Sequence, residues 1–391
     1  MLFLLINEKI IQMKKNYRNL ILFFLFVITT IDIPSFYIVY INQIIVLAVI
    51  TILSIMLERK VNIKPILIWF SASLFLLIIT QIQSIYLEHA ELLWTFVLRV
   101  IFWSFCFAIL YNTLSKTKIS DIKSIISVWI MFYSLTLYLQ FTLYYIFSIE
   151  IDYSTFLGGE SSRIYNSVGF RPSGLTSEPS IYSGIMTSLL VSYYLINKKI
   201  SLTFLIGLFS LLFTISTIGI LLAIFLILTI SLHKISIKRI FFLLLSTSIL
   251  SFFIIDSLIV RYYNFSSGSD TSNNAKLLVI ENLLSKNELS LFGYGMIGLS
   301  KSAPDYYNAL YDLTLFGNLL VIFGLPLGLM IALSVLIILL KNKSFLFYEK
   351  ILILISLIKV TIPNFIFFYL FFLIIIIINN DRHIIHRKPI S

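Results

Sequence analysis

The ten-residue segment RPSGLTSEPS, which begins at Arg171, has the residue types that could hold and activate a charged substrate. Arginine makes a planar, two-pronged contact with phosphate and keeps its charge at any physiological pH. Pro172 and Gly174 predict a tight turn beside Arg171. Glu178 precedes Pro179, a residue that suits the first position of a helix, so we predict that Glu178 is the N-cap of that helix.

Two roles are open for Glu178. The dipole of the helix favours a carboxylate at this position and keeps it ionised. Glu178 could therefore accept a proton from a substrate hydroxyl, or it could serve only as a cap and salt-bridge partner.

Further basic residues lie where the sequence of a membrane protein seldom places them. Of the 29 lysines and arginines, all but eight fall in short clusters between apolar runs. The eight are Arg99, Arg163, Arg171, Arg261, Lys276, Lys286, Lys301 and Lys359. As a set they predict an outward-facing site for an anion such as pyrophosphate, with arginines from two loops as its clamp.

Simpler roles are open for individual members of this set. Arg99 and Lys359 could extend along the helix to the membrane surface, and Lys286 and Lys301 could be solvated loop residues. Asp312, just before a predicted helix, either faces the same cavity or only starts that helix.

The elements that must position these residues are helices in a membrane. The chain has 391 residues, 59% of them hydrophobic and only 12% charged, with a mean hydropathy of +1.00. Soluble domains carry about 25% charged residues. The apolar runs are continuous, which favours helices over the alternating pattern of a membrane barrel. We therefore predict one integral membrane domain, residues 1–391, of all-α class.

About twelve spans (11–12) are expected. We place them at about 19–33, 35–57, 65–85, 92–112, 124–148, 181–197, 200–215, 217–232, 240–257, 315–340, 349–362 and 364–379. The runs 200–232 and 349–379 could each be one long helix, but only splitting both puts the basic clusters on one face. Both termini are then cytoplasmic, and two large polar loops, 149–180 and 258–314, lie outside. Residues 277–284 in the second loop predict a short amphipathic helix.

Other function classes are disfavoured. The net charge of +11 comes from topology signals, not from a nucleic-acid surface. The four histidines show no metal-ligand spacing, so we expect no metal. The single cysteine, Cys106, lies in an apolar run and forms no internal disulfide. The glycines near 293–298 lack the strand–turn–helix context of a nucleotide loop.

With these residues in view, the chain resembles the Wzy-type polymerases of bacterial O-antigen and capsular polysaccharide. RPSGLTSEPS entering a span is similar to the arginine-to-EP motif of that family. The segments LFGYGMIGLS (291–300) and NLLVIFGLPLGL (318–329) also resemble its pattern, as does the layout of spans and two large loops. The similar motifs cover roughly 50 residues.

The resemblance implies a GT-C-like membrane glycosyltransferase in the bacterial cytoplasmic (inner) membrane. Its two large loops would be periplasmic, where it would join oligosaccharide repeat units carried on undecaprenyl pyrophosphate. It implies Arg171, Glu178 and Arg261 as catalytic residues. No cofactor is expected, and a chain-length-determining co-polymerase is a possible partner. The predicted residues for binding substrate and pyrophosphate are Arg163, Arg99, Lys276, Lys359 and Asp312.

Two related activities remain as alternatives. The O-antigen ligases share the architecture but carry a histidine in the large periplasmic loop, whereas residues 258–314 contain none; the only external histidine, His89, belongs to another loop. A flippase for lipid-linked oligosaccharides, or another transporter, would more often place charges inside its spans.

Overall fold

The computed structural model describes residues 2–31, 37–87, 89–156, 170–233, 271–297, 303–361 and 365–387, with a few single positions around 259–268 and at 363. This part of the chain is helical and contains no β-strand. The described helices are α1 (Leu2–Thr30), α2 (Tyr37–Glu58), α3 (Ile63–Tyr86), α4 (Leu93–Leu114), α5 (Ile119–Phe147), α6 (Tyr153–Phe156), α7 (Pro179–Asn197), α8 (Leu202–Phe213), α9 (Thr217–His233), α11 (Thr271–Ser285), α12 (Asn287–Phe292), α13 (Leu315–Lys341), α14 (Phe347–Ser356) and α15 (Ile366–Arg387), with short 3-10 turns η1 (Ala90–Leu92) and η2 (Asp305–Ala309).

Six helices in these ranges are long and apolar enough to cross a bilayer. They are Ile41–Glu58, Ile63–Tyr86, Ala90–Leu114, Ile119–Phe147, Leu315–Lys341 and Ile366–His383. The prediction of an all-α, multi-pass membrane protein is therefore confirmed. Twelve spans stay a prediction, and the span expected at 240–257 lies outside the described residues.

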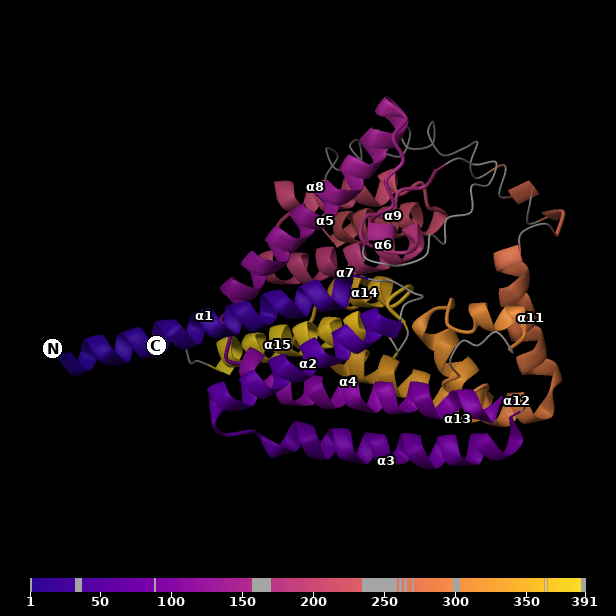
Figure 1. The fold of residues 1–391 in the computed structure, drawn as a ribbon, viewed down its shortest axis with the longest axis horizontal. Coiled ribbons are helices and arrows are strands. Elements are labelled where there is room, and N and C mark those ends of the chain that lie inside the picture. The colour runs from indigo at the N-terminus through magenta and orange to yellow at the C-terminus, as the bar shows by residue number, and fades with distance from the viewer. Residues whose placement is uncertain are drawn as a thin grey trace.

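The helices form a bundle with two distinct ends (Figure 1). We call the end with α11 and α12 the loop end, and the end where α1 begins and α15 ends the terminal end. α3 and α4 run side by side between these ends. The split predicted within 200–232 is confirmed, because α8 ends at Phe213 and α9 begins at Thr217. The split within 349–379 is also present, since a turn with Pro363 separates α14 from α15.

α7 is the central helix, and almost all of its side chains are buried. Its small residues allow close packing, and two of its serines bond to the backbone of the helix itself. Ser183 donates to the carbonyl of Pro179 (2.8 Å), and Ser188 donates to that of Gly184 (3.0 Å). A methyl group on Gly184 would lie 2.9 Å from Cγ of Lys359, so the turn after α14 lies directly on α7.

α13 differs from the single helix predicted at 315–340. It breaks at Gly324 (φ 76°, ψ 172°), a conformation that is almost confined to glycine. Pro326 has no N–H to donate to the carbonyl of Ile322, four residues earlier. Past the break, Gly328 packs on the backbone of Leu319, where an added Cβ would lie 2.6 Å from the carbonyl oxygen. The two halves therefore fold against each other instead of continuing in line.

The loop before α13 satisfies the carbonyls that this break exposes. The backbone N–H of Tyr294 donates to the carbonyl of Val321 (2.7 Å), and that of Gly295 donates to Ile322 (3.0 Å). The side-chain amide of Gln83, on α3, also donates to Ile322 (2.7 Å) and to the carbonyl of Phe292 (2.6 Å). The GYG sequence in the second loop thus supports the broken helix through its backbone N–H groups.

Gly293 gives a test of this arrangement. It has φ 74° and ψ −176°, and an added Cβ would collide with the backbone nitrogen of Gly324. We expect Gly293→Ala to lower the free energy of unfolding by about 3 kcal/mol, from backbone strain and the collision together. Gly268→Ala is the control, because Gly268 also has a positive φ (71°) but nothing lies within 4 Å of its Cβ position. Equal thermal shifts of the two variants in detergent would contradict the packing described.

α14 is shorter than the span predicted at 349–362. Its helix ends at Ser356, and residues 357–361 form a turn that contains Lys359. Leu357 accepts a backbone hydrogen bond from Leu315 (3.0 Å), so this turn lies at the start of α13. Lys359 is therefore in a turn between elements and not inside a continuous span.

A second, smaller core covers the loop end. α11 buries Val279 and Leu283 against η2 and the segment after α12, with Tyr294 and Tyr307 packed edge to face at 5.7 Å. A helix is present over the predicted range 277–284, within α11, which is longer and begins at Thr271, whereas its amphipathic character stays a prediction. This extension places Lys276 on the helix, so the small core also fixes the position of that side chain.

Candidate functional site

The turn that carries Arg171 is anchored on both sides. Before it, the Phe170 ring stacks on Tyr144 at 4.5 Å, and the Phe170 carbonyl accepts a hydrogen bond from the hydroxyl of Tyr145 (2.7 Å). After it, the backbone N–H groups of Ser173 and Gly174 both donate to the side-chain oxygen of one residue on α5, each at 2.9 Å. Arg171 itself is half-buried. Its backbone is thus rigidly placed.

The residue on α5 is Gln140, which is fully buried inside a membrane-spanning helix. Its amide nitrogen donates to the carbonyl of Ile151 (2.8 Å), so both ends of the side chain are bonded to loop backbone. Sequence reasoning missed this residue. The signal was present, because an amide inside an apolar run needs partners and often belongs to a functional site.

Gln140→Leu is expected to lower the free energy of unfolding by about 2–3 kcal/mol, since it leaves two buried N–H groups and one carbonyl without their partner. The loss should also release the Arg171 turn. Thermal unfolding of the purified protein measures the first effect. Gln81→Leu on the exposed side of α3 is the control, and we expect it to change stability little. A neutral Gln140→Leu would show that the turn does not depend on this amide.

Glu178 occupies the predicted position. It is the N-cap of α7 with extended backbone (φ −134°, ψ 145°), and Pro179 follows at the first turn. Its carboxylate is exposed and does not cap the helix; it accepts a hydrogen bond from the hydroxyl of Ser180 (3.0 Å). The side chain is therefore accessible for pairing or for proton transfer.

Three of the predicted binding residues meet in one cluster, although they are far apart in the sequence. Both lysines, Lys276 and Lys359, contact the carboxylate of Asp312: Nζ of Lys276 is 2.5 Å from Oδ2, and Lys359 pairs with Oδ1. The side chains are 27%, 15% and 30% exposed for Lys276, Lys359 and Asp312. We call these three residues the outer cluster. Two positive charges face one negative charge, so the cluster keeps a net charge of +1.

The charge state of Asp312 follows from its surroundings. Burial raises the pKa of the carboxyl, but Lys359 and Lys276 act in the opposite direction and hold it below its usual value. Asp312 is thus ionised at neutral pH. Its place as helix cap is taken by Thr314, whose hydroxyl accepts from the N–H of Gly317 (3.3 Å).

Asn318 fixes the backbone of the outer cluster. It is fully buried near the start of α13. Its amide nitrogen donates to the hydroxyl of Thr361 (2.8 Å) and to the carbonyl of Tyr311 (3.1 Å), while its oxygen accepts from the N–H of Leu313 (3.3 Å). Tyr311 and Leu313 flank Asp312, and Thr361 is two residues after Lys359. The same amide therefore holds both partners of the ion pair, a role that the sequence did not reveal.

Arg99 lies on α4, one turn after a residue that packs against the Asp312 segment. Phe96, one turn before it, stacks on the ring of Tyr311 at 5.4 Å. Arg99 is half-buried and lies over the ring of Trp103 (5.9 Å), on the same face of α4 as Phe96. Phe96 thus contacts the Asp312 segment, whereas the guanidinium of Arg99 extends one turn further along α4, toward Trp103.

The turn that carries Arg171 and Glu178, and the outer cluster, lie toward the same end of the bundle. α7 ends beside Arg382 near the end of α15, so the helix begins on the side toward the loop end (Figure 1), and Glu178 is its N-cap. Lys359 packs on Gly184, which follows Pro179 by little more than one turn. Two predicted members, Arg163 and Arg261, lie outside the described residues and stay predictions.

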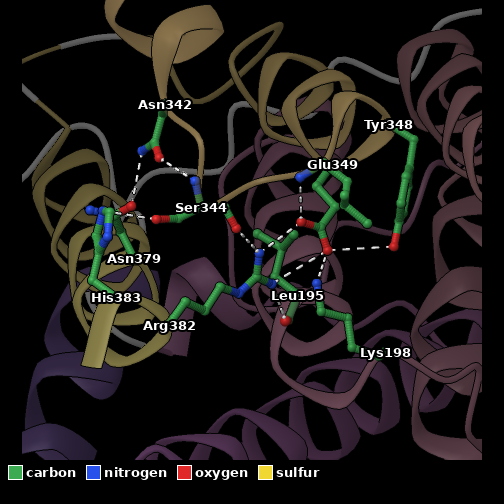
Figure 2. Close-up of polar contacts among 10 residues, drawn as sticks. Leu195, Lys198, Asn342, Ser344, Tyr348, Glu349, Asn379, Arg382 and His383 are labelled. Atoms are coloured by element: carbon green, nitrogen blue, oxygen red, sulfur yellow. Dashed lines mark hydrogen bonds and ion pairs between the residues drawn. The ribbon is translucent and has the colours of Figure 1, made fainter. Parts of the chain in front are cut away.

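Figure 2 shows a second charged cluster, which lies at the terminal end because Arg382 is near the end of α15. The fully buried Glu349 accepts from Arg382 (2.7 Å) and from the N–H of Leu346 (2.9 Å), and it pairs with Lys198. Arg382 also donates to the carbonyl of Leu195 (2.7 Å). We expected Lys198 and Arg382 only to set topology. Because both oxygens of Glu349 are occupied by protein groups, this cluster joins α7, α14 and α15 and leaves little room for a ligand.

Within the described residues, no group of three or more histidine, cysteine or acidic side chains could hold a metal ion.

Comparison with known proteins adds no family to this picture. No protein-family model matches the chain, and no curated protein sequence is similar enough to count as a relative.

Proposed function

We propose that this protein is a polysaccharide polymerase that joins lipid-linked oligosaccharide units at the membrane surface. The observation that carries the proposal is the outer cluster, which keeps a net positive charge at the end of the bundle where α7 presents Glu178. A partly buried positive charge at the same end of the bundle as an exposed carboxylate suits a reaction in which an anion leaves and a hydroxyl loses a proton.

The proposed step is a glycosyl transfer. A sugar hydroxyl of the incoming unit attacks the anomeric carbon of the growing chain, and the bond from that carbon to the phosphate oxygen breaks. The lipid pyrophosphate departs with the bonding electrons. The hydroxyl proton passes to a base, for which Glu178 is the candidate because its carboxylate is exposed.

The cationic residues have a separate role in this step. Arg171 and the lysines of the outer cluster would stabilise the negative charge that develops on the leaving pyrophosphate. Arg261, Arg163 and Arg99 complete the proposed set. No metal enters the proposal, since lysine and arginine supply the positive charge.

The proposal includes an orientation. The loop end faces outward, and both termini face the cytoplasm of a bacterial inner membrane. The GT-C-like architecture and about twelve spans belong to the same proposal. The basic residues near the terminal end support this orientation, since Lys198, Lys350 and Arg382 lie there.

Ligation is the second candidate, and one contact favours it. His89 packs edge to face on Tyr307 at 5.6 Å, so a histidine reaches the second large loop although it comes from another part of the chain. His89 also lies 3.6 Å from Glu91. The lack of a histidine within 258–314 therefore counts less against ligase activity than the sequence suggests.

The surface glycan of a deletion strain distinguishes these activities. The strain is complemented with wild type, Arg171→Ala or His89→Ala, and its glycan is resolved by size. A polymerase predicts single-unit glycan after deletion, no rescue of long chains by Arg171→Ala, and full rescue by His89→Ala. Loss of all surface glycan after deletion, with no rescue by His89→Ala, would favour ligase. Long chains that persist without the gene would contradict the polymerase.

A further inference from the structure

An apolar groove opens on the side of the bundle between α3, α4 and α15. Its volume is about 650 Å³, within the range of small-molecule sites. Trp69 and Ala72 of α3, Phe107 of α4, and Phe372 and Ile376 of α15 are among its lining residues. No residue of the outer cluster lines it, so the groove is separate from the site proposed above.

Three polar groups in the wall of the groove are bonded to the protein itself. The indole N–H of Trp69 donates to the carbonyl of Ile101 (3.0 Å), and the hydroxyl of Ser104 donates to the carbonyl of Val100 (2.7 Å). The hydroxyl oxygen of Tyr111 accepts a hydrogen bond from the amide of Asn380 (2.7 Å). A polar solute would find few free partners here, whereas a hydrocarbon chain would bury apolar surface on both sides.

The end of the groove at the start of α3 is positively charged. Lys64 is exposed and lines the groove together with Asn62, whose side chain caps α3 by accepting from the N–H of Lys64 (3.1 Å). Arg59 and Lys60 come just before them in the turn from α2. This turn thus brings cations to the mouth of an apolar groove.

The neighbouring acid does not cancel this charge. Glu58 is paired with Arg18 (2.9 Å) and with Lys116, which engage both of its carboxylate oxygens. The mouth therefore combines an exposed lysine with the positive N-terminal end of a helix. An apolar chain attached to an anionic head has the matching chemistry.

We propose that this groove binds one chain of an anionic phospholipid, with the lipid phosphate at Lys64. The hydrocarbon lies along α3, α4 and α15, and the head group stays at the terminal end. The site does not depend on the proposed polymerase activity, because it uses none of the same residues and lies toward the opposite end of the bundle.

Lipid binding to the purified full-length protein tests the proposal. Phosphatidylglycerol and phosphatidylcholine with identical chains are titrated into the detergent-solubilised protein, and bound lipid is counted by native mass spectrometry. We expect phosphatidylglycerol to bind more tightly. Lys64→Glu removes a basic residue, which contributes about 1 kcal/mol near an anionic head, and adds a repulsive charge, so it should weaken this binding by about tenfold. Lys343→Glu makes the same charge change at an exposed position outside the groove and should bind as wild type does.

A second variant tests the groove itself. Ala72→Phe places a ring in the groove from an exposed position of α3, so the helix should still fold, and we expect several-fold weaker binding of both lipids. The proposal is overturned if phosphatidylcholine binds as tightly as phosphatidylglycerol, or if Lys64→Glu loses no more lipid than Lys343→Glu. It is also overturned if Ala72→Phe binds both lipids as wild type does.

Discussion

Asp312→Ala is expected to lower the free energy of unfolding by about 3 kcal/mol. Removing one partner of a largely buried ion pair leaves the other charge without compensation, and here two lysines would be left side by side. Thermal unfolding in detergent measures the loss. Asp305→Ala is the matched control, because Asp305 is an exposed aspartate of η2 in the same loop.

A double-mutant cycle separates the ion pair from other effects of the substitution. If the charge left on Lys359 causes the instability, Asp312→Ala combined with Lys359→Met should be less destabilising than the sum of the two single changes. The ion pairs of the outer cluster would be contradicted if the effects of the two single changes on stability simply add. They would also be contradicted if Asp312→Ala lowers stability no more than Asp305→Ala does.

Arg171→Ala is expected to slow chain extension by roughly 10²–10³-fold, the effect of removing one group that stabilises the developing charge. Folding should change little, because Gln140 and Tyr145 hold the backbone of the turn without the arginine side chain. The measurements are the glycan size distribution and the thermal stability of the same variant.

Arg171→Lys refines this test. Lysine keeps the charge but lacks the planar two-pronged donor, so we expect it to restore extension only in part. Lys286→Ala removes an exposed cation at the same end of the bundle and should leave extension unchanged. If the Arg171→Ala variant extends chains as fast as wild type, Arg171 is not part of the site.

Hydropathy predicted most of the fold, but it could not predict the interruptions. The long spans at α3, α4 and α5 match the sequence closely because a bilayer demands a continuous apolar run. At α13 the run is equally apolar, yet Gly324 and Pro326 break the helix. Such a break needs outside donors for its carbonyls, and those come from Gln83 and the loop after α12, which hydropathy does not consider.

The sequence predicted only part of the candidate site, for a related reason. Lys276, Lys359 and Asp312 each stood out as charges in unusual places, but nothing in the chain's pattern indicated that they pair with each other. Their pairing depends on the turn after α14 and on Asn318, a buried amide whose partners only the fold brings together. Gln140 was missed in the same way. Polar side chains inside apolar runs are as informative about a site as the charged ones.

The most direct measurement uses purified protein in lipid vesicles with an undecaprenyl-pyrophosphate-linked repeat unit as the only substrate, and resolves the products by size. The polymerase proposal predicts a ladder of chains and release of undecaprenyl pyrophosphate, both strongly reduced by Arg171→Ala and unchanged by Lys286→Ala. Movement of intact single units across the membrane without any ladder, from protein that is folded by its thermal transition, would contradict the proposal.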